Sequence, residues 1–238
     1  MRTALLTHSC RTMKGSTKPE AERPLRAEPR WTAALAMLAA AAMPFALPRS
    51  LSVLPQWIVA ALVCALLLAA VVTHYIHQPR LNELFGYSVL LVLTIAQIYS
   101  LGTLISALPR HVELAKRLLE SAAVLWVTNV ILFAAWYWRL DAGGPNARDV
   151  RAAHISGAFL FPQMAIIAPG TDGKSMAEVE MWRPQFVDYL ALSFYTATAF
   201  SPTDVPVLSR WAKLMMMVQA ILSLATVALL AARAVNIL

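Results

Sequence analysis

Five long stretches without Asp, Glu, Lys or Arg constrain the fold of this chain more than any other feature. They are Trp31–Pro48, Ser50–Pro79, Leu84–Pro109, Ser121–Trp138 and Leu214–Ala232. A helix needs roughly 20 apolar residues to cross a hydrocarbon core of about 30 Å. Hydrophobic residues make up 59% of the 238 residues and charged residues 14%, more apolar surface than one soluble core of this size can bury. The sequence therefore predicts an all-α integral membrane protein with about five transmembrane helices.

Residues 1–30 differ from the rest, because they hold seven Lys or Arg and three Glu. A basic segment just before an apolar stretch is typical of a disordered cytoplasmic tail that faces anionic lipid. No nucleic-acid-binding motif accompanies the charge, so we predict no nucleic-acid partner. The stretch that follows, Trp31–Pro48, is rich in Ala and contains Pro44. It could span the membrane, lie on its surface, or be removed with a signal peptide.

The remaining organisation follows from the position of the charges. Residues 31–139 hold four of the apolar stretches, and residues 140–184 mix Gly, Pro and charges, which predicts an extramembranous loop. Beyond the loop, Tyr189–Thr203 is uncharged but shorter than each of the five stretches. A segment too short to span and too apolar for a surface loop is typical of a re-entrant helix.

The residues around that segment carry the most specific motif. Residues 196–213 read TATAFSPTDVPVLSRWAK, and a single apolar stretch follows them. This resembles the pore module of potassium channels, in which a pore helix, a T-x-T-x-V-G-Y-G-D filter and an inner helix follow one another. The matching positions are Thr196, Thr198 and Asp204, then Pro206 after one deletion, and Arg210 or Lys213. The resemblance covers residues 185–238, from Gln185 to the C-terminus. The rest of the chain is similar to uncharacterised bacterial multi-spanning proteins that end in the same kind of module.

The resemblance implies a homotetramer in the plasma (inner) membrane, with monovalent cations as the conducted species. The filter-like residues are Thr196, Thr198, Phe200, Ser201, Pro202, Thr203 and Asp204. Potassium filters present rings of backbone carbonyls, and some of their residues need φ > 0, which glycine adopts without strain. Here the two glycine positions hold Ser201 and Thr203, and between them Pro202 has a fixed negative φ and no N–H.

These departures leave three functions open. The first is a weakly selective cation channel in which side-chain oxygens replace the carbonyl rings. The second is a non-conducting membrane scaffold or subunit that retains the pore-module fold. The third is a small-solute transporter, although the chain shows no internal repeat.

The last apolar stretch carries a polar stripe. Its members fall near one line of an α-helix, which Leu230 interrupts; they are Gln219, Ser223, Thr226 and Arg233. Such a stripe lines a pore or forms a seam between helices, and both interpretations are open.

Other candidates predict no chemistry. His74 and His77 have the i, i+3 spacing of metal ligands but no third ligand nearby, so we interpret them as an interfacial polar pair. No enzyme motif occurs, and we predict no enzyme activity, cofactor or metal. Membrane orientation stays open: with five spans, the basic tail places residues 140–184 inside, whereas a potassium-channel pore requires them outside.

Overall fold

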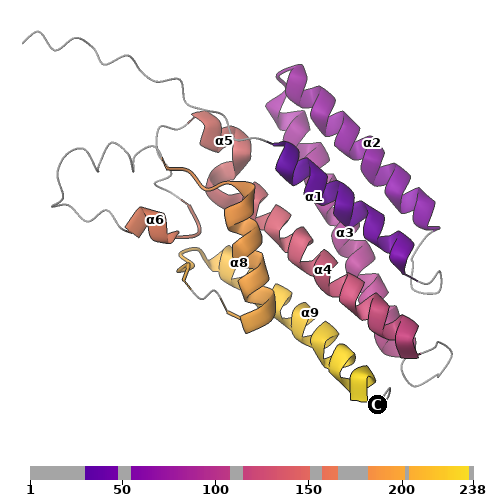
Figure 1. Ribbon diagram of the computed structural model, residues 1–238. Helices are drawn as coiled ribbons and strands as arrows, with labels where there is room; N and C mark the ends of the chain where they lie inside the picture. The colour runs from indigo at the N-terminus through magenta and orange to yellow at the C-terminus, as the bar shows by residue number, and fades with distance from the viewer. Residues whose placement is uncertain are drawn as a thin grey trace, which may run out of the picture.

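The computed structural model describes residues 30–47, 55–107, 115–150, 157–165, 182–201 and 204–235. Within these ranges the chain is helical, apart from connections and one isolated β-bridge. The long helices are α2 (Gln56–Tyr75), α3 (Pro79–Ala107), α4 (Ala115–Leu140) and α9 (Arg210–Val235). The shorter helices are α1 (Trp31–Ala42), α5 (Gly144–Val150), α6 (Pro162–Ala165) and α8 (Phe186–Ala199). Figure 1 shows their arrangement.

Four helices, α2, α3, α4 and α9, are long and apolar enough to cross a membrane. This confirms the all-helical prediction for the described residues and gives the architecture of a multi-pass membrane protein. The helices extend past the charge-free stretches: α3 begins at Pro79, before Arg80 and Glu83, and α9 begins at Arg210. Long charged side chains reach the interface from the terminal turns of a membrane helix, so charges do not end the helices.

The first apolar stretch differs from the other four. Helix α1 has 12 residues, a length of about 18 Å, and a 3₁₀ turn at Met43–Ala46 follows it. Pro44 in that turn has no backbone N–H to continue an α-helix. The small side chains of α1 pack into the bundle, where Ala33, Ala40 and Ala41 are buried against α2 and α4.

Helix α4 lies at the centre of the molecule, between α1–α3 on one side and α8 and α9 on the other (Figure 1). The buried share of its most apolar segment is 61%, whereas the buried share of the most apolar segment of α9 is 22%. Polar side chains fix α4 to α3: the Gln97 amide donates to the Leu125 carbonyl at 2.8 Å, and the Trp136 indole donates to Thr94 Oγ1 at 2.9 Å. The polar side chains of Thr94 and Gln97 on α3 are thus used in helix packing.

Helices α2 and α3 form a hairpin whose turn includes His77 at φ 55°. The Asn82 amide closes it by donating to the Ala70 carbonyl at 2.6 Å. One turn further along α3, Gly86 leaves room for the guanidinium of Arg139 from α4, which a Cβ at position 86 would overlap. Gly86 therefore allows a cation from α4 to enter the seam with α3.

Candidate functional site

Helix α8 begins with a capping box. The Gln185 side chain accepts from the backbone of Asp188, and Asp188 Oδ2 accepts from the Gln185 N–H at 2.7 Å. Burial raises the pKa of the Asp188 carboxyl above its usual value, and the Gln185 N–H opposes this shift. The helix ends after 14 residues, where Phe200 takes the left-handed conformation at φ 57°.

Helix α8 runs antiparallel to α4. Near its start, the Phe186 ring lies 6.1 Å from that of Trp138. In its middle, the Ser193 hydroxyl donates to the Val130 carbonyl at 2.7 Å. The rings of Phe194 and Trp126 form a T-shaped pair with their centroids 5.8 Å apart. The chain of α8 therefore descends from the end of α4 toward its middle.

Helix α8 is also parallel to α9, the next long helix in the chain. The Gln219 amide donates to the Ser193 carbonyl and hydroxyl at 2.9 and 2.7 Å, and the Ser223 hydroxyl donates to the Ala197 carbonyl at 2.6 Å. Both partners advance by four residues, so the two helices point the same way. The C-terminal end of α8 lies opposite the middle of α9, and the described residues 204–209 lead into the start of α9.

Gln219 belongs to a hydrogen-bonded relay across three helices. The Tyr137 hydroxyl of α4 donates to Gln219 Oε1 at 2.6 Å, and Gln219 donates to Ser193, which in turn donates to α4. A second link joins α4 and α9, because the Trp126 indole donates to Ser223 Oγ at 3.0 Å. In an apolar surrounding, these satisfied polar groups fix the register of α8 against both neighbours.

The predicted pore-lining stripe of α9 faces into this seam. Gln219, Ser223 and Thr226 are completely buried within one chain, and Thr226 also donates to the Leu222 carbonyl of its own helix at 3.0 Å. Of the two interpretations of the stripe, these contacts are those of a seam between helices. The Arg233 side chain lies outside the described part of the structure. The opposite face of α9 is apolar and exposed, with Leu214, Met217, Ile221 and Leu224 on it.

The filter-like residues lie at two levels of exposure. Thr196 is buried, and its hydroxyl donates to the Leu192 carbonyl at 2.8 Å. Thr198, Phe200, Ser201 and Asp204 are exposed on the single chain. The Thr198 hydroxyl donates to the Phe194 carbonyl at 2.9 Å, which leaves its oxygen lone pairs available as acceptors. Pro202 and Thr203 lie outside the described residues.

Residues 204–209, which lead into α9, are hydrogen-bonded to residues 158–160 of the preceding loop. Phe159 and Val207 form the β-bridge, with Leu160 N–H donating to the Pro206 carbonyl at 2.9 Å and Leu208 N–H donating to the Ala158 carbonyl at 2.8 Å. Phe159 is fully buried among aromatic rings; its neighbours are Tyr137, Tyr189 and Trp211. Residues 158–160 of the predicted extramembranous loop thus pack against α4 and α8.

A buried polar cluster that the sequence did not predict lies beside this β-bridge. Asp141 is fully buried, accepts from the Tyr189 hydroxyl at 2.7 Å, and also accepts from the Ala158 N–H. Arg148 donates to the Trp138 and Asp141 carbonyls at 2.7 and 3.0 Å. The only sequence signal was a pair of charges, Arg139 and Asp141, within three residues of the end of an apolar stretch, which is also typical of an exposed helix end.

The described residues contain no group of three His, Cys, Asp or Glu side chains placed to hold a metal ion. His74 contacts Arg30 instead of a metal-ligand partner. Comparison of the chain with protein-family models, with curated proteins and with solved structures gives no match.

Proposed function

We propose that this chain is an ion-channel-like protein of the plasma (inner) membrane, in which four copies conduct monovalent cations with weak selectivity. The observation that carries the proposal is the parallel packing of the short helix α8 against the first half of α9. In this interpretation α8 is a re-entrant pore helix, α9 is the inner helix, and residues 200–209 form the pore loop between them.

The dimensions are compatible with a pore loop. Ser223, opposite Ala197, lies more than three turns after Arg210, and this corresponds to a depth of about 20 Å along a helix. The segment 200–209 reaches up to roughly 33 Å when extended, so it can return to the start of α9. Irregular backbone at this depth is tolerated where it is covered by protein or lines a water-filled path.

Charge and exposure favour cations in such a path. The C-terminal end of a helix carries partial negative charge, and the end of α8 points toward the returning loop. The exposed hydroxyls of Thr198 and Ser201 and the carboxylate of Asp204 are oxygen groups that four copies would present to an ion. The free face of α9 would continue the path as an apolar wall.

Recording from purified protein in planar bilayers tests this function. We expect cation currents that the Asp204→Asn variant lowers without unfolding the protein, because the carboxylate concentrates cations at the mouth. Glu120→Gln is the matched control, since Glu120 is an exposed carboxylate on α4. Intact tetramers that stay silent, or equal losses in both variants, would contradict the proposal.

A non-conducting scaffold is the second candidate, and the burial of the α9 stripe favours it. Gln219, Ser223 and Thr226 are buried in the packing of helices within one chain. The exposed face of α9 that the structure describes therefore has few polar groups that could replace the water around an ion. A silent tetramer would support this function.

A further inference from the structure

A cavity of about 460 Å³ lies at the end of the bundle where α1 begins and α2 ends. Its apolar wall includes Met37, Leu67 and Val71, and its polar end includes Arg30, His74 and Arg139. Pockets for small amphipathic ligands span roughly 300–1,000 Å³ and combine an apolar wall with a few polar groups. The described residues that line this cavity come from outside α8 and α9, so the cavity has no role in the proposed ion path.

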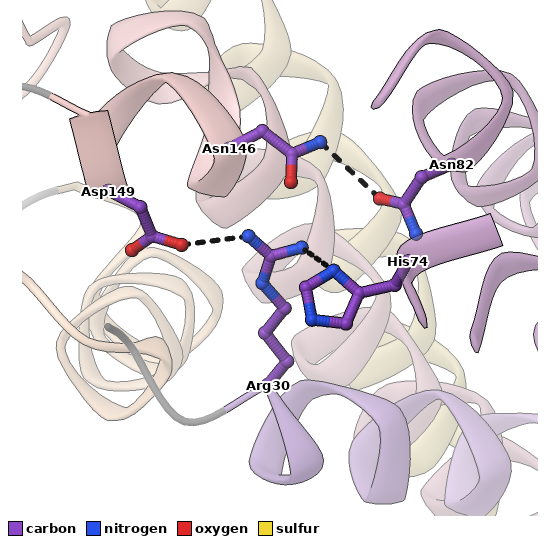
Figure 2. Close-up of polar contacts among 5 residues, drawn as sticks. All are labelled: Arg30, His74, Asn82, Asn146 and Asp149. Atoms are coloured by element: carbon purple, nitrogen blue, oxygen red, sulfur yellow. Dashed lines mark hydrogen bonds and ion pairs between the residues drawn. The ribbon is translucent and has the colours of Figure 1, made fainter. Parts of the chain in front are cut away.

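Arg30 holds the polar end together (Figure 2). Its guanidinium pairs with Asp149 of α5 at 2.8 Å and donates to His74 Nδ1 of α2 at 2.9 Å. Because His74 Nδ1 accepts a hydrogen bond here, the ring is neutral with its proton on Nε2. Beside them, the Asn146 amide donates to Asn82 Oδ1 at 3.4 Å. One carboxylate therefore faces the guanidinium of Arg30.

Arg139 adds a second cation to the same cavity, and the residue is only 5% exposed. It donates to the Asn82 carbonyl and lies 5.4 Å from the centre of the Tyr87 ring, but its Nε has no hydrogen-bond partner. No carboxylate among the described residues lies within ion-pair distance of Arg139, and Glu83 attracts it only from farther away. A buried cation with no carboxylate in contact is only partly compensated, so an anion in the cavity would stabilise it further.

We propose that this cavity binds the anionic headgroup of a membrane phospholipid, with the start of an acyl chain along the apolar wall. Arg139 and Arg30 would hold the phosphate, and His74 Nε2 offers a further donor. Aromatic residues gather at the membrane interface, where headgroups lie. Three of them also line the cavity: Trp31, Tyr75 and Trp138. The apolar wall favours a lipid over a soluble phosphate ion, which has no use for it.

Native mass spectrometry of the purified full-length protein tests the proposal with phosphatidylglycerol and phosphatidylcholine of identical acyl chains. We expect one phosphatidylglycerol to bind at least about fivefold more tightly than phosphatidylcholine, since each nearby cation contributes roughly that factor. Arg30→Gln should lower the affinity for phosphatidylglycerol by about fivefold. Arg80→Gln is the matched control, because Arg80 is an exposed cation at the same end of the bundle and is not among the residues that line the cavity.

Two further measurements complete the test. One separates the effect of charge from that of cavity shape, and the other distinguishes a bound lipid from a free anion. Ala34→Leu adds bulk to the cavity wall and should weaken both lipids without changing charge, in a protein that elutes as a single folded peak. Millimolar inorganic phosphate should leave phosphatidylglycerol bound. Equal affinity for the two lipids, equal loss in the Arg80 variant, or displacement by inorganic phosphate would overturn the lipid site.

Discussion

Gln219 shows what one polar side chain does on an otherwise apolar helix. Its amide accepts from Tyr137 and donates to Ser193, so it joins α9 to both α4 and α8. In water such a residue would exchange these partners for solvent at little cost. In an apolar surrounding it has no such alternative, and these hydrogen bonds select one register of the three helices.

A double-mutant cycle measures this coupling. Gln219→Met keeps the size of the side chain but leaves the Tyr137 hydroxyl without its partner, and we expect a loss of about 1–3 kcal/mol in the free energy of unfolding. Tyr137→Phe should cost about 0.5–1.5 kcal/mol. The double variant should lose less than the sum, with a coupling of about 0.6–1.7 kcal/mol. Unfolding in mixed micelles gives these values, with Thr103→Val as a control for a partly exposed hydroxyl that donates to its own helix. Strict additivity would show that the relay does not link the helices.

At the scale of elements, the sequence predicts helices better than it predicts their partners. Long charge-free stretches identify α2, α3, α4 and α9. In an apolar surrounding the backbone N–H and C=O groups need internal hydrogen-bond partners, and a helix provides them within one segment. The apolar stretch Trp31–Pro48 gives a helix shorter than itself, because Pro44 interrupts it. The short segment before the last stretch does form a separate helix, α8. Which side of α9 packs inward could not be predicted, since Leu230 breaks the polar stripe and either face could meet a neighbour.

The end of α8 carries a testable strain. Phe200 adopts φ 57°, a left-handed conformation that costs a residue with a Cβ about 1–2 kcal/mol and glycine almost nothing. Phe200→Gly and Phe200→Ala lose the same half-exposed ring, so their difference isolates the backbone. We expect the Gly variant to be the more stable by about 1 kcal/mol in thermal unfolding. Within a regular helix the order is reversed, so a more stable Ala variant would show that α8 continues through residue 200.

The free face of α9 predicts an apolar constriction if four copies enclose a path. Ile221 and Leu224 are 65% and 54% exposed on the single chain, and rings of such side chains close a pore by excluding water. Ile221→Ser should therefore raise the single-channel open probability in bilayer recordings. Leu68→Ser is the control, because Leu68 is similarly exposed, at 68%, on α2. An increase in both variants, or in neither, would place the α9 face against lipid instead of water.

At the scale of the whole molecule, α4 joins two parts of different character. On one side, α1–α3 line the cavity around Arg30 and Arg139 together with the end of α4 and α5; on the other, α8 and α9 form the pore-like module. The contacts that complete the second part are long-range, as between Asp141 and Tyr189, which are 48 residues apart. Periodicity and composition describe local patterns, so neither the burial of Asp141 nor the insertion of Phe159 between α4 and α8 could be predicted from them.

The arrangement of whole chains is tested by cross-linking. Around a four-fold axis the exposed end of α8 would face its own copies, whereas Tyr75, on the far side of the bundle and 75% exposed, would face lipid. Cys10 and Cys64 are first replaced by Ser, and Thr198→Cys and Tyr75→Cys are then made separately. Disulfides form only when two Cα atoms lie within about 7 Å, so a short bifunctional maleimide extends the reach. In membranes we expect the Thr198→Cys variant to form covalent dimers and the Tyr75→Cys variant to form none. The native mass of the protein should be that of a tetramer. A monomeric mass, or cross-links that form only through position 75, would exclude a shared axis at α8 and with it the ion path.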